Sequence, residues 1–186
     1  MAQHQSRSTP VPAAKGPECD IAFGFSQVAL NLSGKPRGNL SGADVSATMD
    51  ISPRWAATFD SSYVRAGRDP GSGHSSYVLS LLTGPVFVPA QNDNTRLLVR
   101  ALAGVGLVDG SVRVNQLYYR GWQSRFSWAV GSGIERDISA PLAVRFNVDY
   151  LRTQFVSSAG TLKPQNDIRF VASLVLRFAA RRPDYR

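Results

Sequence analysis

The sequence has no long apolar run. A helix needs roughly 17 or more consecutive apolar residues to cross a bilayer. The longest candidate stretch, Tyr77 to Val88, is interrupted four times by Ser, Thr, Gly or Pro. Helical membrane spans are therefore excluded, and 186 residues suit a single domain.

Cysteine and histidine are also scarce. Cys19 is the only cysteine, so no disulfide can form within the chain. The two histidines, His4 and His74, lie far apart and with one cysteine cannot build a metal site. The glycines at 104, 106, 131 and 133 are not followed by a helix pattern, so they predict no phosphate-binding loop. We expect no cofactor and no metal.

The net charge of +8 invites a nucleic-acid interpretation. However, the basic residues are spread along the chain, and the one tight group is Arg181, Arg182 and Arg186. No helical reading element or basic helix face is visible. We expect no nucleic-acid partner, and a surface that faces anionic lipid headgroups explains the charge as well.

Two segments, 142–150 and 168–178, alternate apolar and polar residues with a period of two. This period predicts strands with one apolar and one polar face. Weaker versions of the same alternation occur at 21–32, 45–51, 55–63, 75–88, 97–107 and 126–135. The apolar parity shifts after Phe25, so we expect a β-bulge near Gln27. The sequence thus predicts eight strands.

The predicted connections alternate between short and long. Short turns fall near residues 52, 91 and 139, and longer loops near 37, 70, 116 and 160, with 109–123 as the longest. This alternation is typical of antiparallel barrels whose short turns face the periplasm. With an even strand number, both termini lie on the short-turn side. We interpret 19–178 as the barrel domain, 1–18 as a disordered tail and 179–186 as a basic tail.

The first 18 residues contain no apolar core, so no signal peptide is predicted in them. An exported protein would then be a mature chain with an added Met1. A cytosolic protein is the alternative.

Alternation alone does not say whether the apolar face meets lipid or a protein core, because a lipocalin-like soluble barrel has the same period. The polar face consists of small residues with charges at mid-strand, and Lys and Glu are few. Aromatic residues gather toward strand ends, as in membrane girdles. We therefore predict an all-β, eight-stranded antiparallel up-and-down transmembrane β-barrel. If Val99, Phe146 and Leu174 faced the axis while Arg100 and Arg145 faced outward, this prediction would be wrong.

Charged residues of the polar face recur at similar depth. They are Asp60, Arg100, Glu135, Arg145, Asp149 and Arg169. A buried charge without a partner is too costly to keep, so we expect these side chains to neutralise one another in a lumen polar network. The competing interpretation is a glycosidase, which needs two convergent carboxylates from among Asp60, Glu135 and Asp149.

A lipid-modifying enzyme would depend on His74 together with Ser75, Ser76 and Asp69. A Gly-rich loop offers such a site little preorganisation. We expect no enzymatic activity.

Arginine and aromatic residues in the predicted loops resemble a contact surface. This contact surface comprises Lys35, Arg37, Arg68, Arg113, Tyr118, Tyr119, Arg120, Trp122 and Lys163. Its basic residues would face lipopolysaccharide phosphates or a protein partner. Its aromatic residues could instead anchor the barrel at the membrane interface.

The chain resembles the outer-membrane β-barrel domain proteins of Gram-negative-type bacteria, related to the OmpA/OmpX-type barrels, over about Cys19 to Phe178. The resemblance is carried by LTGPVF at 82–87, AVGSGI at 129–134, LAVR at 142–145 with DY at 149–150, and LVLRF at 174–178. It implies a monomeric integral outer-membrane barrel with a side-chain-filled lumen, long extracellular loops and periplasmic termini. The implied partners are outer-membrane lipid, lipopolysaccharide and an extracellular or periplasmic protein. A narrow porin-like pore is the alternative.

Overall fold

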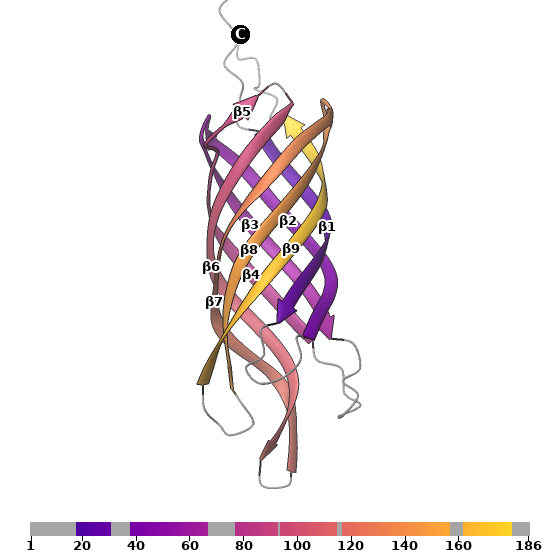
Figure 1. Ribbon diagram of the computed structural model, residues 1–186, viewed down its shortest axis with the longest axis vertical. Coiled ribbons are helices and arrows are strands. Elements are labelled where there is room, and N and C mark those ends of the chain that lie inside the picture. Colours follow the sequence, from indigo (N-terminus) through magenta and orange to yellow (C-terminus); the bar gives the residue numbers. More distant parts are fainter. Residues whose placement is uncertain are drawn as a thin grey trace, which may run out of the picture.

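The computed structural model describes residues 18–30, 38–66, 77–92, 94–114, 117–156 and 162–179. Eight long antiparallel strands close into a barrel, and a two-residue strand lies at one rim (Figure 1). The strands are β1 (Glu18–Leu30), β2 (Gly38–Ser52), β3 (Trp55–Ala66), β4 (Tyr77–Phe87), β5 (Gln91–Asn92), β6 (Thr95–Val114), β7 (Leu117–Ser139), β8 (Leu142–Val156) and β9 (Leu162–Ala179). None of the described residues forms a helix long and apolar enough to span a membrane.

The long strands pair with their neighbours in sequence, and two further pairings close the wall. β4 pairs with β6 past the short β5, and β1 pairs with β9. Glu18 therefore lies opposite Ala179, at the start of the first strand and the end of the last. Closure gives each long strand two hydrogen-bonded neighbours. The predicted eight-stranded antiparallel up-and-down barrel is confirmed.

The apolar face of the strands is the outer face of the barrel. Val99, Phe146 and Leu174 are 43%, 45% and 45% exposed, whereas Arg100 and Arg145 are 5% and 6% exposed. A lipocalin-like barrel would have its apolar face inward. The prediction that the apolar residues face outward and the arginines inward is confirmed.

The two rims of the barrel differ. The turn rim, at the top of Figure 1 with β5, carries the short connections from β2 to β3 and from β7 to β8. The register of the pairing shifts beside both of these turns. Exposed Trp55 and Phe178 lie at this rim, and exposed Tyr63 and Tyr150 lie toward the opposite one, the loop rim. Aromatic residues therefore flank the apolar exterior at both ends, as predicted.

β1 contains no bulge near Gln27, so that prediction is wrong. Its pairing with β2 and β9 runs without a register shift from Cys19 to Ala29. Val28 is buried and faces the interior in the regular alternation. It belongs to an apolar layer formed by Val28, Leu40, Val64 and Val78. The change of apolar parity therefore marks an apolar layer inside the barrel rather than an inserted residue.

Residues 109–114 and 117–123 lie in paired strands and not in a loop, which corrects a second prediction. β6 and β7 pair continuously from Thr95 with Arg136 to Val114 with Leu117. Among the described strands, 110–114 pair only with β7 and 117–126 pair only with β6. This β6–β7 arm projects beyond the loop rim (Figure 1). Gly110 and Ser111 suggest a loop in the sequence, but pairing with the partner strand keeps both residues extended.

Candidate functional site

Side chains from the long strands fill the interior of the barrel. Besides the layer around Val28, three apolar clusters lie inside. The first comprises Leu82, Leu102, Ala129 and Leu151, the second Ala56, Val86, Val88 and Leu98, and the third Ala22, Ala143 and Val175. Two groups of ion-paired side chains occupy the rest, a central cluster and a turn-rim cluster. The candidate site is this ion-paired interior.

The central cluster is built on two arginines that share two carboxylates. Arg100 donates to Asp149 from Nε (2.8 Å) and Nη2 (2.6 Å), and to Asp60 from Nη1 (3.2 Å). Arg169 donates to Asp149 from Nε (2.9 Å) and to Asp60 from Nη1 (2.7 Å). None of the four side chains is more than 5% exposed. Charge-assisted, partly bidentate hydrogen bonds therefore offset much of the cost of burying these charges.

A third carboxylate, that of Asp44, completes the central cluster. Its Oδ2 lies 3.8 Å from Arg169 Nη1, and that oxygen is buried without a hydrogen bond. The same guanidinium nitrogen donates to Ser62 Oγ at 3.2 Å. The central cluster thus holds three carboxylates against two guanidiniums, and Asp44 is its least well-paired member.

The turn-rim cluster is centred on Arg145. This side chain donates from Nε to Glu135 Oε2 at 2.7 Å and from Nη2 to Asp20 Oδ2 at 2.8 Å. Its Nη1 lies 3.3 Å from Thr48 Oγ1. Arg177 Nη2 approaches Glu135 Oε1 (2.5 Å) and Asp137 Oδ1 (2.6 Å). Glu135 therefore accepts from two arginines that come from different strands.

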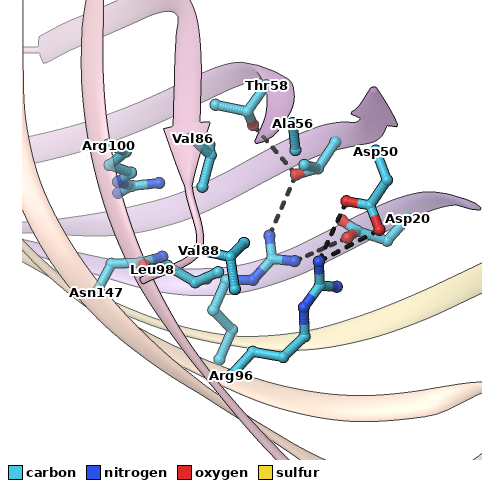
Figure 2. Close-up of a pocket in the computed structure, with 12 residues that line it drawn as sticks. Asp20, Asp50, Ala56, Thr58, Val86, Val88, Arg96, Leu98, Arg100 and Asn147 are labelled. Carbon is cyan, nitrogen blue, oxygen red and sulfur yellow. Dashed lines mark hydrogen bonds and ion pairs between the residues drawn. The ribbon is translucent and has the colours of Figure 1, made fainter. Parts of the chain in front are cut away.

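A second part of the turn-rim cluster lies beside a small cavity. Arg96 Nη2 donates to both oxygens of Asp50 at 3.2 Å, and Figure 2 shows this pair next to Asp20. Apolar side chains, Val86 and Val88 among them, line the other side of the cavity. Its volume is about 10 Å³, which is room for about one water molecule.

The structure places the six residues of the predicted lumen polar network inside the barrel. Asp60, Arg100, Asp149 and Arg169 lie in the central cluster, and Glu135 and Arg145 lie in the turn-rim cluster. Sequence reasoning missed Asp20, Asp44, Asp50, Arg96, Asp137 and Arg177 as further members. Each of these lies on the polar side of its strand. Asp44 lies at mid-strand, and the alternation extended toward the turn rim would have found the other five.

The carboxylates proposed for glycosidase chemistry are all paired. Asp60, Glu135 and Asp149 each accept hydrogen bonds from at least two arginines. Guanidiniums rather than substrate groups occupy these carboxylates. The alternative site around His74, with Asp69, Ser75 and Ser76, lies outside the described residues. Within the described ranges, no group of three or more His, Cys, Asp or Glu side chains could hold a metal ion.

The predicted contact surface divides into two parts. Lys35, Arg37 and Arg68 lie outside the described residues. The others lie on strands: Arg113 on β6, Tyr118, Tyr119, Arg120 and Trp122 on β7, and Lys163 on β9. The prediction that these latter residues belong to loops is wrong. All but Lys163 belong to the β6–β7 arm.

No protein-family model and no curated protein matches the sequence, but solved structures match the fold. Ail, the attachment invasion locus protein of Yersinia pestis, is 18% identical with a TM-score of 0.57, covering 87% of this chain and 98% of that one. Neisserial surface protein A is 12% identical with a TM-score of 0.64, covering 87% and 97%. The outer membrane protein OprG from Pseudomonas aeruginosa is 13% identical with a TM-score of 0.59, covering 89% and 98%. At these identities the likeness concerns the fold, and this chain therefore has the fold of the eight-stranded outer-membrane β-barrels.

Proposed function

We propose that the protein is an integral outer-membrane β-barrel with a side-chain-filled lumen, and that its role is structural or in surface interaction. The observation that carries this proposal is the polarity of the barrel: apolar residues cover the outside, and ion pairs fill the inside. In water, so large an apolar exterior would cause association. In a bilayer the same surface faces hydrocarbon.

The height of the apolar band supports the same proposal. On β3, Trp55 and Tyr63 mark the two ends of the outward apolar face and are eight residues apart. At about 3.4 Å per residue, this separation is about 27 Å along the strand. With a strand tilt of about 40°, the band is about 20 Å tall, close to the ~25 Å band of outer-membrane barrels.

Phe146→Arg tests the membrane location directly. Phe146 lies near the middle of β8 and is 45% exposed. In lipid vesicles we expect this substitution to lower the free energy of unfolding by about 2–4 kcal/mol, because a charge would enter hydrocarbon. Urea titration read by heat-modifiable gel migration gives the value. Phe146→Leu is the control and should cost less than about 1.5 kcal/mol. A change within about 0.5 kcal/mol for Phe146→Arg, as at an ordinary water-exposed position, would contradict the proposal.

The filled interior predicts that the barrel conducts no steady current. Two interior cavities, one at the turn-rim cluster and one beside Asp167, each have room for about one water molecule. Heat-modifiable gel migration first verifies that the protein has inserted. The inserted protein should then give no stable channel openings in planar bilayers. Steady single-channel openings would instead favour the narrow pore.

The surface role rests on the contact surface and the β6–β7 arm. The arm carries Arg113 and Arg120 beyond the loop rim on paired strands. Ail has been crystallised in complex with the heparin analogue sucrose octasulfate, so a barrel of this fold can carry a polyanion. For this chain we propose that the basic residues of the contact surface meet lipopolysaccharide phosphates or a protein partner.

The proposed orientation is supported by the position of the strand ends. β1 begins and β9 ends at the turn rim. Short turns face the periplasm in outer-membrane barrels, so the turn rim is the proposed periplasmic side. Segments 1–18 and 179–186 would then be periplasmic tails of a monomeric barrel domain spanning 19–178.

A further inference from the structure

An arginine lies over a tyrosine ring on the outer wall near the loop rim. Arg65 on β3 stands directly opposite Tyr77 on β4, and its Cζ lies 5.4 Å from the centroid of that ring. Tyr63 also stacks with Tyr77, with centroids 5.8 Å apart and an interplanar angle of 17°. The ring and the cation attract one another, which orients the guanidinium on the outer surface.

A similar placement of residues occurs a second time, on β7 and β8. Tyr150 is followed two residues later by Arg152, on the same outward parity, and Arg152 stands opposite Trp128. The rings of Trp128 and Tyr150 have centroids 5.8 Å apart. β6 lies between the two strand pairs, so the sites occupy different parts of the wall. Two independent strand pairs thus share a Tyr-x-Arg sequence that faces an aromatic residue on the neighbouring strand.

The depth of these arginines matches that of lipid headgroups. Tyr63 and Tyr150 end the apolar band on their strands, and each arginine lies two residues farther toward the loop rim. Two residues of a strand tilted by about 40° rise about 5 Å along the barrel axis. That step leads from the aromatic girdle into the headgroup layer. A guanidinium there presents planar donors that match the oxygens of a phosphate.

We propose that Arg65 and Arg152 each form a binding site for the phosphate of a lipid headgroup in the leaflet at the loop rim. The Tyr77 ring holds the Arg65 guanidinium in position. Trp128 stands opposite Arg152 in the neighbouring strand pair, and both rings lie at the boundary of the acyl chains. This inference rests on the proposed membrane location and adds the residues and the ligand group.

A third outward arginine provides a matched control. Arg136 is exposed on β7 near the turn rim, and its partners across the sheet are Thr95 and Val144. It carries the same charge on the same outer wall, but no aromatic residue stands opposite it. If charge alone determined binding, Arg136 and Arg65 would bind a lipid phosphate equally well.

Native mass spectrometry of the barrel in a neutral detergent tests the proposal, using phosphatidic acid and diacylglycerol with the same acyl chains as probes. The unmodified protein should retain up to two phosphatidic acid molecules in preference to diacylglycerol. Arg65→Gln and Arg152→Gln should each weaken binding at one site about tenfold, as expected for the loss of a charge-assisted hydrogen bond. Arg136→Gln should bind like the unmodified protein, and Tyr77→Leu should weaken the Arg65 site although its charge remains.

Equal losses in Arg65→Gln and Arg136→Gln would overturn the proposal in favour of diffuse charge. Equal retention of phosphatidic acid and diacylglycerol would overturn the proposal in favour of apolar contact. Displacement of phosphatidic acid by millimolar inorganic phosphate would show that the sites bind free phosphate and not a lipid headgroup, which would also overturn it. In each of these cases a heat-modifiable barrel leaves the proposed membrane location intact. A chain that is monodisperse and folded in plain buffer would overturn that location and this site together.

Discussion

Arg169→Gln is expected to lower the free energy of unfolding by about 3–5 kcal/mol, because it breaks a buried ion pair from one side. Arg169 is fully buried and donates to both Asp60 and Asp149. Without it, three carboxylates of the central cluster would share Arg100 alone. Urea unfolding of the barrel in lipid vesicles, followed by heat-modifiable migration, measures the loss.

Asp44→Asn is the matched control within the same cluster. The Asp44 carboxylate has a buried oxygen without a hydrogen bond and adds a third negative charge to two positive ones. Its neutralisation should change the free energy of unfolding by less than about 1 kcal/mol or raise it. A neutral Arg169→Gln, or an Asp44→Asn as harmful as Arg169→Gln, would contradict the pairing described for the central cluster.

Gly104→Ala is expected to destabilise the barrel by about 1–3 kcal/mol or to prevent its closure. A Cβ at this position would overlap the carbonyl oxygen of Leu81 on the neighbouring β4. Because the obstacle is backbone, β4 and β6 would have to separate at a seam that closes the barrel. Refolding yield and urea unfolding both report the effect.

Gly106→Ala, two residues along the same strand, separates this clash from a general effect of adding a methyl group. Its Cβ would lie 2.6 Å from Ser127 Oγ, the end of a side chain that can rotate. We expect a change of less than about 1 kcal/mol, since Gly→Ala also reduces the entropy of the unfolded chain. Similar losses at both positions would show that the close approach of β4 and β6 at Gly104 is not the cause.

The closed barrel and the direction of its faces follow from residues with strict alternation. Arg145, Phe146 and Asn147 illustrate why. A period of two assigns neighbours to opposite faces, and charges need partners or water. In a narrow barrel with lipid outside, the charged face can only point inward. The lumen members at mid-strand were predictable for this reason.

The errors arise where neighbours across the sheet decide the structure. In the sequence, Val28 suggests that the apolar side of the strand changes from one face to the other. In the structure, Val28 is one of the apolar side chains that fill the interior near the loop rim in place of polar ones. The β6–β7 arm looks like a loop, because its extension depends on pairing between segments and not on local propensity. Which carboxylate pairs with which arginine likewise depends on the stagger of the strands around the barrel, which single-strand patterns do not contain.

The pairing of β1 with β9 also bears on how the chain is made. β1 is synthesised first, yet its second neighbour is the last strand of the barrel. Until β9 emerges, the nascent sheet has two open edges and an apolar surface. Such a species is prone to associate with other chains. Strand closure over this sequence distance is also inherently slow, so we expect association between unclosed chains to compete with folding.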